Sequence, residues 1–232
     1  MLTLAYGVPP TEFTWSQRDK DGKVVSTDKY TPLSFYNKLW GYDLNNDYVL
    51  VMNDPSREYY KVYQIEYDRH TYDGHDWVYL NLPNEEVKPM LIASLKDSTA
   101  MYISCDVNKF LNRQKGVMDL KNFDYESLLG VTMTMDKKER IITHASASSH
   151  AMTLIAVDID KATSKPTKWM VENSWGKENG FKGNYIMTDE WFNEYMFRFV
   201  LNKKYVPESV AKLLKQKPIK LPAWDPMFAP EE

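Results

Sequence analysis

The sequence of 232 residues contains a single cysteine, Cys105, and no long apolar run. One cysteine cannot form an internal disulfide, a pattern typical of proteins from reducing compartments. No stretch reaches the roughly 20 apolar residues that a membrane-spanning helix needs. Residues 1–7 carry no basic region and no cleavage site, so we expect no secretory signal peptide. Together these absences predict a cytoplasmic protein without a membrane partner.

An excess of charge of one sign is also missing. The formal net charge is -3 at pH 7, from 29 basic and 32 acidic residues. Because nucleic acids and anionic membranes attract proteins mainly through basic surface, the composition predicts no nucleic-acid partner. With 43% hydrophobic and 26% charged residues, the chain has the composition of an ordinary globular protein and can bury a sizeable core.

The histidines outside the β-rich region form no clear metal-binding pattern. His70 and His75 lie close to Asp73 and Asp76 in the sequence. Their loop lacks the tight ligand spacing that zinc sites use. We therefore expect no metal and no cofactor.

Local patterns predict both helices and strands, and hence the α+β class. Asp21-Gly22 indicates a hairpin turn between two short strands. Thr31-Pro32 is typical of a helix N-terminus, with threonine as the cap and proline in the first turn. Asn84 is expected to cap an amphipathic helix. The proline-rich segment 218–226 is expected to lie extended over a surface without regular structure.

The second half of the chain is predicted to be mainly β. Alternating apolar residues indicate strands over residues 152–157, 168–172 and 184–187. Thr188 is expected to cap a short helix, Asp189–Tyr195, and a further strand should follow it.

The strongest functional signal is a histidine and an asparagine at the ends of two neighbouring strands. His150 precedes an apolar strand, and Asn173 follows the next strand and begins the sequence Asn-Ser-Trp-Gly. A cysteine nucleophile reacts as a thiolate, which a nearby imidazole makes available at neutral pH. That imidazole must be held in one tautomer by a second hydrogen-bonding group. We predict His150 as the general base, Asn173 as its orienting partner and Trp175 as a cover for their hydrogen bond.

Two other residues compete for catalytic roles. His144 precedes the small-residue run 145–149 and has no apolar strand directly behind it, so we expect it at the surface. Cys105 lies within a predicted strand, away from any helix N-terminus whose dipole would favour a thiolate. We expect a buried, inert thiol. The alternative, that Cys105 is itself the nucleophile of a self-sufficient enzyme, keeps the chain order Cys, His, Asn.

Longer blocks of sequence resemble the bleomycin hydrolase and aminopeptidase C family of papain-like cysteine peptidases, along nearly the whole chain. The blocks that carry this resemblance are Pro9-Pro10 with Phe13-Thr14-Trp15, Thr31-Pro32-Leu33-Ser34-Phe35-Tyr36, Tyr79-Leu80-Asn81-Leu82-Pro83, Cys105-Asp106-Val107, His150-Ala151-Met152, Trp169-Met170-Val171-Glu172-Asn173-Ser174-Trp175-Gly176, Met187-Thr188-Asp189-Glu190-Trp191-Phe192 and Leu221-Pro222-Ala223-Trp224-Asp225-Pro226-Met227. The last three blocks are particular to this family.

The resemblance implies a papain-like fold: a right-hand β-barrel domain with flanking helices. Residues 1–100 would be part of the family's inserted helical and hairpin region. Residues 101–217 would be the β-rich domain that carries the histidine and asparagine, and residues 218–232 an extended C-terminal tail. The resemblance covers only the C-terminal half of the longer family members, so we expect a truncated chain that lacks the left-hand domain.

In the family the nucleophile lies on a helix of that left-hand domain, in a Gln…Cys-Trp context that this sequence does not contain. The resemblance therefore implies the C-terminal portion of a cysteine aminopeptidase, inactive alone. It would contribute His150 and Asn173 to the hydrolysis of peptide substrates. Its partner would be a missing N-terminal half or further copies of the chain. The alternative is an inactive, peptidase-derived binding or assembly module.

Overall fold

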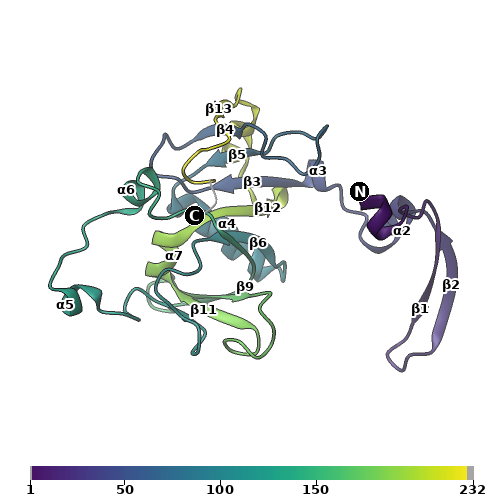
Figure 1. Cartoon of the computed structure of the whole chain (residues 1–232), viewed down its shortest axis with the longest axis horizontal. Coiled ribbons are helices and arrows are strands. Elements are labelled where there is room, and N and C mark those ends of the chain that lie inside the picture. The colour runs from purple at the N-terminus through teal and green to yellow at the C-terminus, as the bar shows by residue number, and fades with distance from the viewer. Residues whose placement is uncertain (1, 229–232) are drawn as a thin grey trace. The chain divides into compact units, whose positions relative to one another are not determined.

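The computed structural model describes residues 2–228, and the chain divides into two compact units between Asp47 and Tyr48 (Figure 1). Helices and strands occur in both units, so the predicted α+β class is confirmed. Among the described residues, no helix combines the length and the apolar character needed to cross a bilayer.

The first unit is a β-hairpin with short helices. Its elements are α1 (Leu2–Tyr6), β1 (Phe13–Arg18), β2 (Val24–Tyr30), α2 (Pro32–Leu39) and α3 (Leu44–Asp47). Gly22 sits in the hairpin turn with φ +80°, a conformation that glycine adopts without strain. At the start of α2, the Ser34 amide donates to Thr31 Oγ1 and the Thr31 amide donates to Ser34 Oγ. Both predicted turn and cap signals are confirmed.

Aromatic rings join the hairpin to α2. The ring of Phe35 meets those of Phe13, Trp15 and Tyr30 edge-on, at centroid distances of 5.1, 5.2 and 5.3 Å. Edge-to-face pairs of this kind add to the stabilisation from buried area.

The second unit is built on one sheet of 11 strands, in the order β13-β4-β5-β3-β12-β6-β9-β10-β11-β8-β7 (Figure 1). Neighbouring strands from β3 through β12, β6, β9 and β10 to β11 pair antiparallel, which places distant parts of the sequence side by side. The strands are β3 (Tyr48–Met52), β4 (Lys61–Ile65), β5 (Val78–Asn81), β6 (Met101–Cys105), β7 (Leu111–Asn112), β8 (Val117–Met118), β9 (His150–Ile159), β10 (Pro166–Glu172), β11 (Asn184–Thr188), β12 (Met196–Asn202) and β13 (Ile219–Leu221).

Helices pack on this sheet or connect its strands. They are α4 (Asn84–Lys96), α5 (Tyr125–Leu129), α6 (Lys137–Ile142), α7 (Asp189–Tyr195), α8 (Glu208–Ala211) and two 3-10 helices, Lys203–Tyr205 and Lys212–Lys215. The predicted cap of α7 is confirmed, since the Trp191 amide donates to Thr188 Oγ1. The predicted cap of α4 is wrong. Pro83 occupies the cap position, and the Asn84 side chain donates to Asn193 instead.

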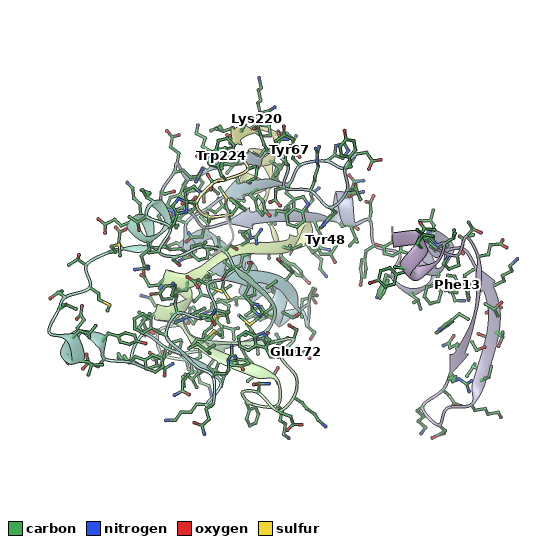
Figure 2. All side chains as sticks on the ribbon, in the orientation of Figure 1. Phe13, Tyr48, Tyr67, Glu172, Lys220 and Trp224 are labelled. Atoms are coloured by element: carbon green, nitrogen blue, oxygen red, sulfur yellow. The ribbon has the colours of Figure 1, made fainter. Side chains whose placement is uncertain are left out.

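The C-terminal segment was expected to lack regular structure, which is wrong for three of its residues. Ile219–Leu221 forms β13, which pairs parallel to β4 at the edge of the sheet. The flanking residues Pro218 and Pro222 cannot donate to a ladder, and an edge strand tolerates that loss. Lys220 and Trp224 lie at the top of the view and Glu172 near the bottom (Figure 2). Residues 229–232 of the predicted tail lie outside the described residues.

The compact units and the predicted domains have different boundaries. Strands β3 to β5, helix α4 and β13 belong to the same sheet unit as residues 101–217. The division into residues 1–100, 101–217 and 218–232 rests on the family's inserted region, and it stays a prediction.

Candidate active site

His150 is the first residue of β9, the strand between β6 and β10, and it pairs with Cys105 of β6. Side chains of a strand alternate between its faces, so His150 shares a face with Met152 and Leu154. Those two residues are in the core, whereas His150 is only partly buried. The apolar strand thus anchors the histidine and leaves its ring at the end of the strand.

Asn173 follows the last residue of β10, Glu172, which is labelled in Figure 2. Its backbone amide donates to the Gly183 carbonyl at 3.0 Å, which ties it to the residues before β11. The residue is 8% exposed, so it is screened from water. Asn173 Oδ1 lies 2.9 Å from His150 Nε2. The structure therefore brings the two predicted residues together.

The backbone around Asn173 fixes which nitrogen of His150 carries the proton. The Ser174 amide lies 2.8 Å from Asn173 Oδ1, and a backbone amide can only donate. The Asn173 atom in this position is therefore the oxygen. Since that same oxygen faces His150 Nε2, Nε2 must donate to it, and neutral His150 has its lone pair on Nδ1.

Trp175 lies beside the ring of His150. Its ring centroid is 5.0 Å from that of His150, with 40° between the planes. Asn179 Nδ2 donates to the Trp175 carbonyl at 2.6 Å, and the ring of Tyr185 meets the indole edge-on at 5.6 Å. Trp175 is thus held at its backbone carbonyl and at its ring. Its role as a cover for the His150–Asn173 bond stays a prediction.

One hydrogen-bond donor of the His150–Asn173 pair has no acceptor in the described part of the chain. Asn173 Nδ2 is buried and has no hydrogen-bond partner within residues 2–228. A buried amide donor without an acceptor costs free energy of folding. The orientation of the Asn173 side chain therefore depends on the contacts of its oxygen.

The two competing residues lie where the sequence predicts them. His144 is exposed, with φ +59°. Cys105 is fully buried in the core. Burial raises the pKa of its thiol, and the neighbouring Asp106 raises it further, so the thiolate is suppressed at neutral pH.

Within the described part of the chain, no group of three or more histidine, cysteine or acidic side chains is placed to hold a metal ion. The ring of His70 packs edge-on against Trp77 at 4.7 Å. His70 therefore has an aromatic contact in the structure.

Sequence reasoning missed one residue of this region. The guanidinium carbon of Arg113 lies 4.3 Å from the ring centre of Trp175. Residues 108–130 read as a loop with one short helix, and an arginine in such a loop carries no distinguishing pattern. The Arg113 loop comes close to Trp175 because β8 pairs with β11. That pairing involves only two residue pairs and joins segments distant in sequence, so the sequence alone gives little sign of it.

Comparisons with known proteins identify the family of the chain. The model of the Peptidase C1-like family matches residues 1–228. The chain belongs to the Peptidase C1-like family. This match and the similarity to curated relatives confirm the resemblance to the bleomycin hydrolase and aminopeptidase C family.

The relatives include bleomycin hydrolase from Homo sapiens, which is 42% identical over 99% of this chain and 51% of its own length. Aminopeptidase C from Lactobacillus delbrueckii subsp. lactis is 38% identical over 99% of this chain and 51% of its own length. The chain spans about half the length of the curated relatives it matches.

A crystal structure of PepW from Lactobacillus rhamnosis HN001 is similar in fold. It has a TM-score of 0.91 and 35% identity, and covers 98% of this chain and 52% of the PepW chain. The fold is thus the predicted α+β fold of papain-like cysteine peptidases.

Proposed function

We propose that this chain is the C-terminal portion of a cysteine aminopeptidase and that it supplies the general base His150 and its orienting partner Asn173. The observation that carries the proposal is the double use of Asn173 Oδ1, which accepts from both the Ser174 amide and His150 Nε2. A histidine held with Nδ1 unprotonated is ready to accept a proton from a thiol on that side.

The reaction would proceed in two proton transfers. His150 Nδ1 takes the proton of the nucleophilic thiol, and the thiolate attacks the carbonyl carbon of the peptide bond. The resulting imidazolium keeps its Nε2–H bond to Asn173 Oδ1. It then gives the Nδ1 proton to the departing amine, and water releases the acyl group by the reverse sequence. Trp175 would keep water away from the Nε2–H bond throughout.

The thiol would come from a segment outside these 232 residues. Cys105 is the one cysteine of the chain, and its burial and raised pKa disfavour a nucleophilic role. The relatives, named as bleomycin hydrolases and aminopeptidases, are about twice the length of this chain, which leaves room for such a segment. We therefore expect the chain to be inactive alone.

Peptides with a free N-terminus are the proposed substrates, by analogy with the relatives named as aminopeptidases. The proposed partner is an N-terminal half or a further copy of the chain. The single cysteine supports a reducing compartment, and we propose the cytoplasm.

The second candidate is an inactive binding or assembly module, which the absence of a suitable nucleophile within this sequence favours. The intact His150–Asn173 hydrogen bond favours the enzyme, because a module would gain nothing from a base held in one tautomer.

A hybrid enzyme tests the proposal. In it, this chain replaces the matching half of aminopeptidase C from Lactobacillus delbrueckii subsp. lactis, and aminoacyl-coumarin hydrolysis is measured under reducing conditions. We expect activity in the hybrid and a loss of roughly 10³-fold or more in His150→Ala. His144→Ala, which changes an exposed histidine nearby, should leave activity unchanged.

Two results would contradict the proposal. Equal activity of His150→Ala and the unaltered hybrid would remove His150 from the chemistry. A folded hybrid without activity would support the binding module instead.

A further inference from the structure

Arg113 belongs to no part of the mechanism above, yet it lies over the tryptophan beside the base. Its guanidinium carbon is 4.3 Å from the Trp175 ring centre, and the Trp175 ring centroid is 5.0 Å from that of His150. A cation over an indole is the most favourable form of cation–π contact. Arg113, Trp175 and His150 thus form a continuous series of contacts that ends at the proposed base.

The loop that carries Arg113 is fixed to the region around Asn173. It joins β7 to β8, and β8 pairs with β11. The Ile186 amide donates to the Gly116 carbonyl at 2.8 Å. Gly116 and Gly180 are in such close contact that a Cβ on Gly116 would lie 2.7 Å from the Gly180 Cα. The backbone of the arginine loop is therefore packed against Gly180 and hydrogen-bonded to Ile186.

The Arg113 side chain has no carboxylate to hold it. Among residues 2–228, none of the ion pairs involves Arg113, and the residue is exposed. Tyr185 also packs against Trp175. Burial raises the pKa of the Tyr185 hydroxyl, and the positive charge of Arg113 opposes that rise. Within residues 2–228, the cation–π contact of Arg113 is with the Trp175 indole.

We propose that Arg113 is a positioning residue for the His150–Asn173 pair, which it keeps covered by holding Trp175 in place. The inference deepens the proposed function and rests on it. Because Asn173 Nδ2 has no partner, a water molecule that reached the pair could turn the amide or take over the Nε2 proton. Holding the indole in place excludes that water and preserves the tautomer that the base needs.

Hydrogen exchange of the His150 ring Nε2–H, measured by NMR on the purified chain, tests the proposal. Arg113→Met replaces the guanidinium by a shorter, unbranched apolar side chain and so removes the charge. We expect about two- to five-fold faster exchange in this variant, the equivalent of the roughly 0.5–1 kcal/mol of an exposed cation–π contact. Arg113→Lys should restore most of the protection. Lys115→Met removes the same charge from the same loop and should exchange at the unaltered rate.

The backbone amide of Leu154, in the middle of β9, is followed in the same samples. Unchanged Leu154 exchange together with faster Nε2–H exchange in Arg113→Met supports the proposal. Three results overturn it: an unchanged Nε2–H rate in Arg113→Met, equal acceleration in Lys115→Met, or equal acceleration of Leu154, which would indicate general loosening.

One further result would contradict the proposed function as well as this inference. If the unaltered chain had no proton on His150 Nε2, the His150–Asn173 pair would not exist as described, and the proposed function would fail with the inference. The measurement on the unaltered chain thus separates the two failures.

Discussion

Cys105 and His150 lie directly opposite each other in the antiparallel pair of β6 and β9. Opposite residues in such a pair place their side chains on the same face of the sheet. This adjacency makes a Cys105–His150 catalytic pair tempting. However, the thiol is fully buried and its pKa is raised, while the His150 ring is bonded to Asn173.

We therefore predict that Cys105 does not react with thiol reagents in the folded chain. Labelling by a disulfide reagent should be at least about 10²-fold slower in native buffer than in urea, because the thiolate is both suppressed and inaccessible. The urea-unfolded chain provides the reference rate. Labelling of the native chain at the rate of an exposed thiol would restore Cys105 as a candidate nucleophile.

Asn173 is predicted to act through the single oxygen that orients His150. In the hybrid enzyme, Asn173→Ala should lower kcat/KM by about 10²-fold, because the ring loses the acceptor that fixes its tautomer. Asn173→Asp keeps an acceptor for both donors and should retain more activity. Ser174→Ala keeps the backbone amide and serves as the control. A change of less than about three-fold in Asn173→Ala would contradict this role.

Lys137 is predicted to make stability depend on pH. Its Nζ donates to Asn53 Oδ1, the Asn193 carbonyl and the Met196 carbonyl, at 2.6, 3.2 and 2.5 Å. These acceptors favour the ammonium, but burial dominates and lowers the pKa of Lys137 to about 7.

The unfolded chain keeps the Lys137 proton up to about pH 10.4, and the folded chain releases it near pH 7. Between these values the unfolded state binds more protons, so the free energy of unfolding should rise with pH. Urea unfolding of the unaltered chain and Lys137→Met at several pH values checks this. The advantage of the unaltered chain should grow from pH 7 to 10, with exposed Lys138→Met as control. A constant difference would contradict the lowered pKa.

Arg57 is predicted to hold the C-terminal segment on the sheet. It pairs with Asp54 at 2.5 Å and with Asp225 at 2.8 Å, and both carboxylates are almost fully buried. Beyond Asp225, the Met227 carbonyl accepts from the Ser148 amide, two residues before His150. The ion pairs thus keep the segment close to His150.

Removing Arg57 would leave two buried carboxylates without a cation. Arg57→Met should lower the free energy of unfolding by about 3–5 kcal/mol, measured in urea. Arg69→Met breaks a more exposed and longer pair with Asp76, at 3.6 Å, and should cost less than about 1 kcal/mol. Similar small losses in both variants would contradict this role for Arg57.

The sequence predicted the elements whose signals are local. Thr31 and Thr188 cap helices as expected because a hydroxyl and the next turn decide that geometry. The proximity of His150 and Asn173 was predictable for a related reason: each sits at the end of an apolar strand, and antiparallel pairing of adjacent strands brings such ends together.

Features that depend on contacts distant in sequence were not predicted. Strand β13 forms because β4 offers it a free edge, which the prolines around it do not reveal. Arg113 reaches Trp175 only through the short pairing of β8 with β11. Asn84 is displaced from its expected cap role by a partner more than a hundred residues away, Asn193.

The central claim, that Asn173 holds His150 as a base with its lone pair on Nδ1, is tested most directly by nitrogen-15 NMR of the histidine rings. The folded chain is measured near pH 9, where an ordinary imidazole is neutral, and the His150 signals are assigned from their absence in His150→Ala. We predict one proton bound to Nε2 and an unprotonated Nδ1. A proton on Nδ1, or rapid averaging between the two nitrogens, would contradict the account.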